Sequence, residues 1–118
     1  MKTLVLGAST NPSKYSYLAI NRLVTNGYKV YAIGTKEGTV GGVKITTKKK
    51  IFTDIDTVTL YVSAKNQADF YNYIIGLKPR RVLFNPGTEN PFFERLLTKN
   101  NIEFERACTL VLLSLGAY

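Results

Sequence analysis

Histidine and tryptophan are absent from this sequence of 118 residues, and cysteine occurs once. The absence of histidine excludes Ser-His and Cys-His nucleophilic catalysis and zinc sites with imidazole ligands. A single cysteine excludes an internal disulfide and a thiolate cluster, and gives no sign of an oxidising compartment. No convincing acid–base pair takes the place of these groups. The sequence therefore favours a non-catalytic protein without a metal site over an enzyme.

Long apolar stretches are missing as well. No run of about 18 successive apolar residues is present, so no transmembrane helix is expected. The N-terminal stretch Met1–Gly7 is too short for the core of a signal peptide, and no small-residue cleavage site follows it. These absences predict a cytoplasmic protein without a membrane partner. The length predicts a single domain spanning residues 1–118.

Acidic residues are few relative to basic ones. The chain has sixteen Lys and Arg and eight Asp and Glu, which gives a formal net charge of +8. A basic protein attracts phosphates, nucleic acid or anionic membrane, and the charge by itself does not choose among them. The basic residues are scattered apart from Lys48–Lys50, and a run of this kind is usually a solvated surface. No RNA-binding signature or base-reading basic helix is present, so the sequence does not favour nucleic acid as a partner.

Strand-like and helix-like patterns alternate along the chain. Short apolar or β-branched runs predict strands at residues 3–6, 29–33, 57–62, 81–84 and 102–105. Helical spacing of apolar residues predicts helices at residues 13–26, 65–77, 91–100 and 107–115. The glycine-containing segment 37–50 is expected to be a loop with room for a short edge segment. This order predicts an α/β fold: a doubly wound parallel sheet of about five strands in three α/β/α layers.

The loop after the first strand has the composition of a phosphate-binding loop. In open parallel sheets, ligands bind beyond the carboxyl ends of the strands. Small residues let backbone N–H groups approach a phosphate, and the following helix N-terminus adds partial positive charge. The candidate ligand contacts are Gly7, Ala8, Ser9, Thr10, Asn11, Pro12, Lys14 and Tyr15. The loop matches neither G-x-G-x-x-G nor the P-loop, and the alternative is a turn selected for helix capping by Ser13.

The end of the second strand discriminates between nucleotides. An NAD site carries an acidic residue at this point to hold the ribose diol. This chain has Gly34, Thr35 and Lys36 instead. A lysine here suits a ligand with an extra phosphate on its ribose, and both NADP and coenzyme A have one. The alternative is that Lys36 is an ordinary exposed lysine.

Two later loops and the cysteine complete the candidate site. Val62 and Ser63 follow the third strand and offer an apolar backbone to an adenine. After the fourth strand comes a stiff polar turn, made of Asn85, Pro86, Gly87 and Thr88. Its alternative interpretation is a turn that only serves to cap the next helix through Thr88 or Asn90. Cys108 is either a small buried hydrophobic residue or a thiol that faces the ligand and forms a mixed disulfide with a thiol ligand.

These motifs together resemble a known family, the small stand-alone CoA-binding domain proteins. Those proteins are in turn similar to the CoA-binding domain of the succinyl-CoA synthetase α subunit. The resemblance runs in order along nearly the whole chain, through Gly7–Ser16, Asn26–Val30, Lys36, Asp54–Val58, Phe84–Asn90 and Ala107–Thr109. The first motif and the Asn-Pro-Gly-Thr-Glu-Asn motif are fairly specific in combination.

The resemblance implies a Rossmann-like fold with coenzyme A lying across the strand ends. Carried over by position, the backbone of Gly7–Ser9 and Lys14 would meet phosphates, and Lys36 would lie by the 3′-phosphate. Val62 and Ser63 would border the adenine, while Asn85–Thr88 would face the pantetheine. Two departures stand out. Gly34-Thr35 replaces the Asn-Pro that usually precedes the lysine, and the phosphohistidine of the synthetase has no counterpart.

The leading interpretation is a nucleotide-binding module, without catalytic residues, for coenzyme A or an acyl-CoA. One alternative is a minimal NADP-binding oxidoreductase. The absence of the second and third glycines of the G-x-G-x-x-G motif counts against it. Another is a basic nucleic-acid-binding protein that uses the net charge of +8. The apolar segment Leu110–Leu115 is a candidate surface for a homodimer.

Overall fold

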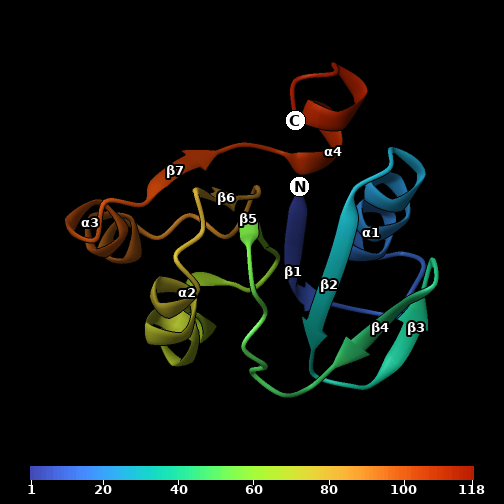
Figure 1. Cartoon of the computed structure of the whole chain (residues 1–118), viewed down its shortest axis with the longest axis horizontal. Helices are drawn as coiled ribbons and strands as arrows, with labels where there is room; N and C mark the ends of the chain where they lie inside the picture. Colours follow the sequence, from blue (N-terminus) through green and yellow to red (C-terminus); the bar gives the residue numbers. More distant parts are fainter.

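A seven-stranded sheet runs through the centre of the computed structural model, which describes all 118 residues (Figure 1). Its strands lie in the order β3-β4-β2-β1-β5-β6-β7. Their bounds are β1 (Lys2–Ala8), β2 (Lys29–Gly34), β3 (Gly38–Val40), β4 (Val43–Thr46), β5 (Ile55–Leu60), β6 (Arg81–Phe84) and β7 (Glu103–Arg106). Every neighbouring pair is parallel except β3 and β4.

The sheet is doubly wound around β1. From β1 the chain passes to β2 and the β3–β4 hairpin on one side, then crosses back to β5, β6 and β7 on the other. The order of strands therefore reverses between β1 and its two neighbours, β2 and β5. This confirms the predicted α/β fold with a parallel sheet, and places the topological switch point at the end of β1.

The sheet has two more strands than the five expected. Residues 38–46, predicted to be mostly loop, form an antiparallel hairpin whose turn is Gly41-Gly42. Val40 and Ile45 of the hairpin are buried against the core. β4 then joins the parallel sheet through only two pairs, Ala32 with Ile45 and Ile33 with Thr46. Strands of three and four residues give little periodicity to read, which is why the sequence pattern did not reveal them.

Helices cover both faces of the sheet, as the three-layer prediction requires. Their bounds are α1 (Tyr15–Thr25), α2 (Tyr71–Leu77), α3 (Pro91–Lys99) and α4 (Thr109–Ser114). Side chains of β1 alternate between the two layers. Val5 belongs to the core cluster that contains residues of α1 and α4, whereas Leu4 and Leu6 belong to the cluster with residues of α2 and α3. None of these helices has the length and hydropathy needed to cross a bilayer.

The predicted helix over residues 65–77 is shorter and begins differently. Two 3₁₀ turns, Ala64–Asn66 and Ala68–Phe70, precede α2. Gln67 lies between them, fully buried, and its side chain bonds to the backbone of neighbouring loops. This segment is therefore held by contacts with loops rather than by a continuous helical ladder.

The last residue of the chain packs beside the first strand, so that both termini lie at the same end of the molecule (Figure 1). The hydroxyl of Tyr118 lies 2.7 Å from Oγ1 of Thr3. The Tyr118 ring contacts the guanidinium of Arg81 at 4.7 Å and the ring of Tyr28 at 4.9 Å. The amino ends of β1, β2 and β6 are thereby fastened together, on the side away from the strand ends where a ligand is expected.

Candidate functional site

An open cleft of about 670 Å³ lies at the switch point of the sheet, between the loops that follow β1, β2 and β5. We call it the switch-point cleft. Nine predicted ligand residues line it: Gly7, Ala8, Ser9, Lys14, Tyr15, Gly34, Thr35, Val62 and Ser63. The cleft has the volume of an ordinary small-molecule site. Segments far apart in the sequence thus meet where the strand-end rule expects a ligand.

Six further residues line the same cleft and were not predicted. They are Ser16, Ile33, Thr47, Tyr61, Asn66 and Phe70. Ser16, Ile33 and Tyr61 are neighbours of predicted residues, so a wider window around each strand end would have included them. Thr47 follows β4, and Phe70 belongs to the segment before α2. Their positions depend on a strand and a 3₁₀ turn that the sequence pattern did not reveal.

Glycine is required where the strand ends converge. Gly7 has a φ of +93°, and a Cβ atom there would lie 2.7 Å from the carbonyl oxygen of Tyr61. At Gly34, a Cβ atom would lie 2.3 Å from the carbonyl oxygen of Ala8. Larger residues at these positions would push the three loops apart. The two glycines therefore allow the walls of the cleft to approach each other.

Hydrogen bonds from its own polar side chains stabilise the loop after β1. Oγ of Ser9 accepts a hydrogen bond from the N–H of Asn11 at 3.1 Å. Oδ1 of Asn11 accepts from the N–H and the hydroxyl of Ser13, at 3.0 and 2.8 Å. The loop is also closed by the N–H of Lys14, which donates to the carbonyl of Asn11. Ser9, Asn11 and Ser13 thus stabilise the turn that presents the helix to the cleft.

The N-terminus of α1 carries no side-chain cap. Lys14 occupies the capping position and makes no capping hydrogen bond, so the interpretation of Ser13 as the helix cap is wrong. N–H groups in the first helical turn have no intrahelical partner. They lie beside Lys14, Tyr15 and Ser16, which line the cleft. An uncapped helix N-terminus next to a lysine is well suited to an anionic group.

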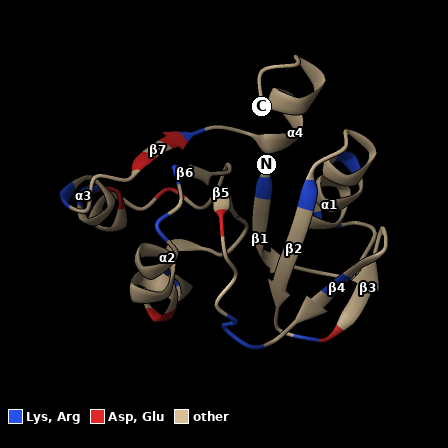
Figure 2. Ribbon diagram, in the orientation of Figure 1, with Lys and Arg blue, Asp and Glu red and all other residues tan.

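Lysines gather around the carboxyl edge of the sheet. Lys36 is exposed two residues beyond β2, outside the lining of the switch-point cleft. Lys48–Lys50 follow β4, and the chain there is blue along the lower edge of Figure 2. Lys49 packs over the ring of Phe70 at 5.0 Å and donates to the carbonyl of Asp69. One of these lysines is therefore held against a residue of the cleft wall.

The β5 side of the cleft is apolar with polar edges. Val62 and Tyr61 are half-buried there, and Ser63 is exposed. Burial raises the pKa of Tyr61 to about 12, so its phenol remains protonated at neutral pH. Oγ of Ser63 accepts a hydrogen bond from the side chain of Asn66 at 3.1 Å. This wall offers contact area and hydrogen bonds, and no group that would gain or lose a proton near neutral pH.

Gln67 connects this wall to the loop after β6. Its Nε2 donates to the carbonyls of Val62 and Thr88, at 2.8 and 2.7 Å. Its Oε1 accepts from Nδ2 of Asn90 at 2.9 Å. Asn90 in turn caps α3 by accepting from the N–H of Phe93, so the predicted capping by Asn90 is confirmed. A buried amide with both ends satisfied fixes the spacing of two loops at the site.

The polar turn Asn85–Thr88 is held by the protein itself. Asn85 is buried, donating to Oγ1 of Thr59 and the carbonyl of Leu60 and accepting from the N–H of Thr109. Oγ1 of Thr88 donates to the carbonyl of Asn85. Pro86 and Gly87 are exposed, with a φ of +91° at Gly87. None of the four lines the switch-point cleft, so their contact with a ligand stays a prediction.

The remaining predicted residues lie at the rim or beyond it. Thr10, Asn11 and Pro12 are exposed on the loop after β1, outside the lining of the cleft. Cys108 is partly buried and directly precedes α4. The residue is neither fully buried nor part of the cleft wall.

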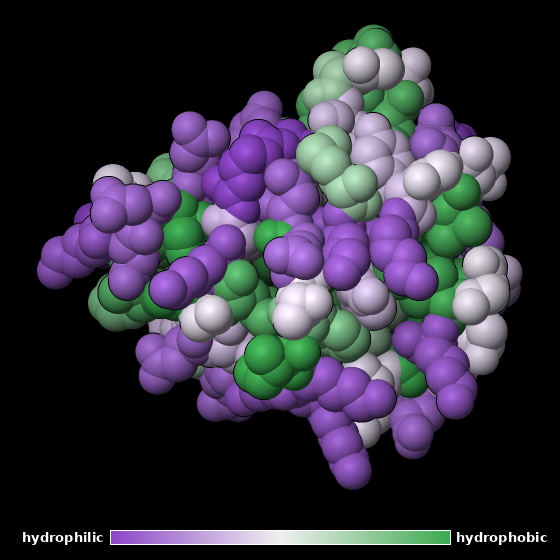
Figure 3. Space-filling model, viewed as in Figure 1, coloured by the Kyte–Doolittle hydropathy of each residue, from purple (hydrophilic) through white to green (hydrophobic).

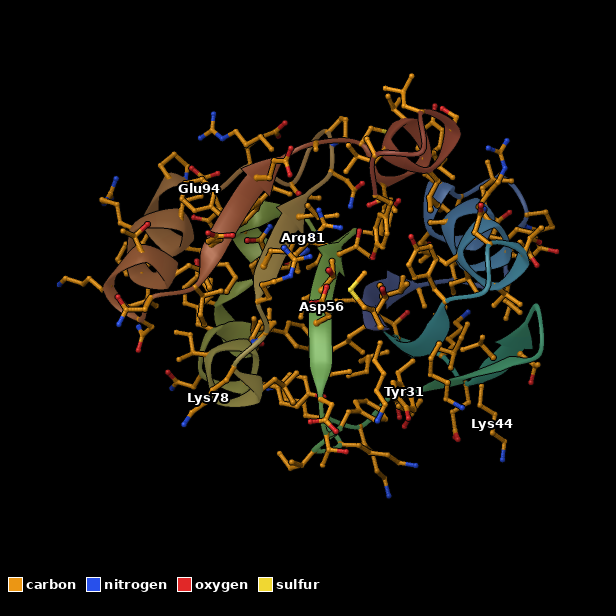
Figure 4. The ribbon with its side chains drawn as sticks, turned by 45° about the horizontal axis from the view of Figure 1, so that its top comes forward. Tyr31, Lys44, Asp56, Lys78, Arg81 and Glu94 are labelled. Carbon is orange, nitrogen blue, oxygen red and sulfur yellow. The ribbon has the colours of Figure 1, made fainter.

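Carboxylates near the sheet are engaged in ion pairs. Glu94 accepts two hydrogen bonds from Arg106 at 2.9 Å, which hold its pKa below the usual value. Asp56 pairs with Arg80, and its pKa is likewise lowered by that hydrogen bond. Figure 4 labels both carboxylates, and neither lines the switch-point cleft. No group of three His, Cys, Asp or Glu side chains is arranged to hold a metal ion.

The strand order, the parallel ladders and the cleft at the reversal point define a Rossmann-like α/β protein. The comparison with protein families is consistent with this class. The chain belongs to the CoA binding domain family, because the model of that family matches residues 1–114. None of the curated proteins matches the sequence.

Solved structures include close relatives of this fold. One, a protein described as uncharacterized, is 47% identical, with a TM-score of 0.96 over 99% of this chain and 97% of that one. A cell-free protein, ID.343 from Thermus thermophilus, is 19% identical, with a TM-score of 0.88 over 99% of this chain and 90% of that one. The dinucleotide-forming acetyl-coenzyme A synthetase 1 of Candidatus Korarchaeum cryptofilum is 19% identical. That match has a TM-score of 0.73 and covers 89% of this chain and 25% of the synthetase. The two distant matches show the fold alone.

Proposed function

We propose that this protein is a non-catalytic module that binds coenzyme A or an acyl-CoA in the switch-point cleft. The observation that carries the proposal is the cleft itself, which joins the uncapped N-terminus of α1 to the ends of β2 and β5. Membership of the CoA binding domain family supports coenzyme A among the phosphate-bearing ligands that such a cleft would accept.

The pyrophosphate of the ligand is assigned to the loop after β1. The free N–H groups at the start of α1 and the Lys14 ammonium offer positive charge there. The backbone of Gly7–Ser9 lies on the same wall. Anion binding at this point needs no rearrangement of the loop, because its side chains already stabilise the turn.

The adenosine end is assigned to the walls formed by β2 and β5. Val62 and Phe70, both half-buried, provide apolar surface for a purine ring. Lys36 is exposed two residues beyond the end of β2, next to these walls in the sequence. We assign to it the 3′-phosphate that distinguishes coenzyme A from its dephosphorylated form.

The pantetheine is assigned to the turn Asn85–Thr88, whose exposed Pro86 and Gly87 lie at the same edge of the sheet. Cys108 follows β7 at this edge and is partly buried. The proposal includes a cytoplasmic location, since a single cysteine gives no sign of disulfide use. It assigns no reaction to the module, because the titratable side chains that line the cleft are Lys14, Tyr15 and Tyr61, without a carboxylate or a thiol.

Calorimetric titration of the ligand-free protein with coenzyme A, NADP and ATP at near-physiological salt tests the proposal. We expect saturable one-site binding of coenzyme A, clearly tighter than either other nucleotide. Lys14→Ala should weaken coenzyme A at least about tenfold, in line with loss of a charge-assisted contact. Lys99→Ala removes an exposed lysine from the far end of α3 and serves as the matched control. Tighter binding of NADP than of coenzyme A, or no binding of coenzyme A, would refute the assignment.

A further inference from the structure

The first half of β2 lacks a strand partner on the side away from β1. β2 pairs with β1 along its whole length, from Lys29 to Gly34. With β4 it pairs only through Ala32 and Ile33. Backbone N–H and C=O groups of residues 29–31 that point away from β1 therefore meet no strand. An unpaired edge of this kind is a template for an added strand.

A second cleft, of about 710 Å³, opens where the hairpin diverges from β2. We call it the β2 notch. In Figure 1, β4 leaves β2 at an angle, and the β3–β4 hairpin forms the opposite side of the opening. The notch and the switch-point cleft share no lining residue. Their linings are adjacent along the chain at two places, between Ala32 and Ile33 on β2 and between Thr46 and Thr47 at the end of β4.

The two faces of the notch differ in character. Side chains of a strand alternate between faces. Val30 and Val43 belong to the layer under α1, where Val24 and Tyr28 also line the notch. On the opposite face, the ring of Tyr31 stacks on Phe52 at 4.4 Å. The face toward α1, lined by Val24, Tyr28, Val30 and Val43, is thus aliphatic and aromatic and carries no charged side chain among these residues.

Lysines occupy the other face. Lys29 and Tyr31 share one side of β2, and Nζ of Lys29 lies 5.7 Å from the centre of the Tyr31 ring. On β4, Ile45 faces the core under α1, so the preceding Lys44 lies on the opposite face of the strand. Lys44 is exposed there, on the same face as Lys29 and Tyr31. Figure 4 labels Tyr31 and Lys44, which come from the two strands that border the notch. Lys50 also lines the notch. Glu37 is the one carboxylate in the lining.

The positive charge of the β2 notch indicates what kind of segment it binds. The lining holds three lysines, Lys29, Lys44 and Lys50, and one carboxylate, Glu37, so the notch attracts an acidic segment. A strand with acidic side chains on one face and apolar side chains on the other would match both faces of the notch. We propose that the β2 notch binds an extended acidic segment of a partner protein by strand addition. The segment pairs its backbone with residues 29–31 and directs its carboxylates toward Lys29 and Lys44.

The test uses a blocked hexapeptide of alternating glutamate and valine. Titrated into ¹⁵N-labelled protein, it should shift the amide signals of residues 29–31 and 43–45 saturably. Affinity should fall about tenfold between low and high salt, because exposed charges are screened. The double variant Lys29→Glu/Lys44→Glu should lose about tenfold in peptide affinity. Coenzyme A binding by this variant should equal that of the unmodified protein, which separates the notch from the proposed ligand site.

Two control peptides decide between strand addition and simple charge attraction. One has the same composition with its three glutamates grouped before its three valines. The other keeps the alternating order but carries N-methyl groups on the backbone, which block ladder hydrogen bonds. Both should bind at least about tenfold more weakly than the alternating peptide. Equal binding of all three, shifts centred on residues 48–50, or no shift at millimolar peptide would overturn the proposal.

Discussion

At the scale of single residues, Gly7 shows how little space separates the loops of the cleft. Its φ of +93° is costly for any residue with a Cβ atom, and that atom would also collide with the carbonyl of Tyr61. Gly27 has a similar φ of +84° with nothing within 4 Å of a Cβ atom. The two positions therefore separate the cost of the backbone conformation from the cost of the collision.

We expect Gly7→Ala to lower the free energy of unfolding by about 3 kcal/mol, since conformational strain and overpacking add. Gly27→Ala should cost about 1 kcal/mol, from the conformational strain alone. Urea denaturation of both variants measures the difference. Equal losses would show that the loops after β1 and β5 can separate without cost.

Lys36 is the residue whose proposed role depends most on position. It is exposed beyond the end of β2, where an acidic residue would hold the ribose of NAD. We expect Lys36→Glu to weaken coenzyme A by about tenfold and dephospho-coenzyme A much less, because only the former carries the 3′-phosphate. Calorimetry with both ligands measures this, and Lys99→Glu is the control. An equal loss for the two ligands would show that Lys36 does not contact the 3′-phosphate.

At the scale of elements, an ion pair fastens α3 to β7. The carboxylate of Glu94 is buried, and Arg106 at the end of β7 donates to both of its oxygens. The hydrogen bonds from Arg106 keep the pKa of Glu94 below its usual value of 4.5. A depressed carboxyl pKa stabilises the folded state above the unfolded-state pKa. That contribution is lost as the pH falls through the folded-state pKa.

The corresponding prediction concerns Glu94→Gln. At pH 7 this variant should be less stable than the unmodified protein, because the buried Glu94 carboxylate loses its ion pair with the half-exposed Arg106. The difference should begin to shrink as the pH falls below about 4.5, where the Glu94 carboxyl of the unfolded chain becomes protonated. It should be lost once the pH has fallen through the lower folded-state pKa of Glu94. Urea denaturation at several pH values measures it, with Glu37→Gln as an exposed control. A difference that stayed constant down to pH 2 would contradict this account.

At the scale of the whole molecule, two surfaces differ in their capacity to hold a second copy. Every residue of the edge strand β7 is exposed, and three of its four residues are charged. Charges on an edge strand oppose pairing with another edge. The exposed face of α4 is apolar instead: Val111 is 51% exposed and Leu115 72%. Figure 3 shows this end of the molecule as a gathering of green and white atoms.

We therefore expect the protein to form a homodimer built on residues 110–115. Sedimentation equilibrium at about 100 µM should give the mass of two chains for the unmodified protein. It should give the mass of one chain for Val111→Glu/Leu115→Glu, because buried charge opposes association. Phe92→Glu alters an equally exposed apolar residue on α3 and should leave the dimer intact. A single-chain mass for the unmodified protein would remove α4 as a dimer surface.

The sequence by itself determined the class of the fold, the succession of its main strands and helices along the chain, and the loop that begins the cleft. Alternation of apolar runs with helical spacing is a local property, and Gly7–Tyr15 is a continuous motif, so both can be recognised without tertiary contacts. Only the tertiary structure decided that residues 38–46 join the sheet, since strands of three or four residues are defined by their partners. It also decided that Thr47, Phe70 and Gln67 belong to the site. Their roles arise from packing between segments more than 20 residues apart in the chain, as in the bond from Gln67 to Thr88, and no local pattern encodes such contacts.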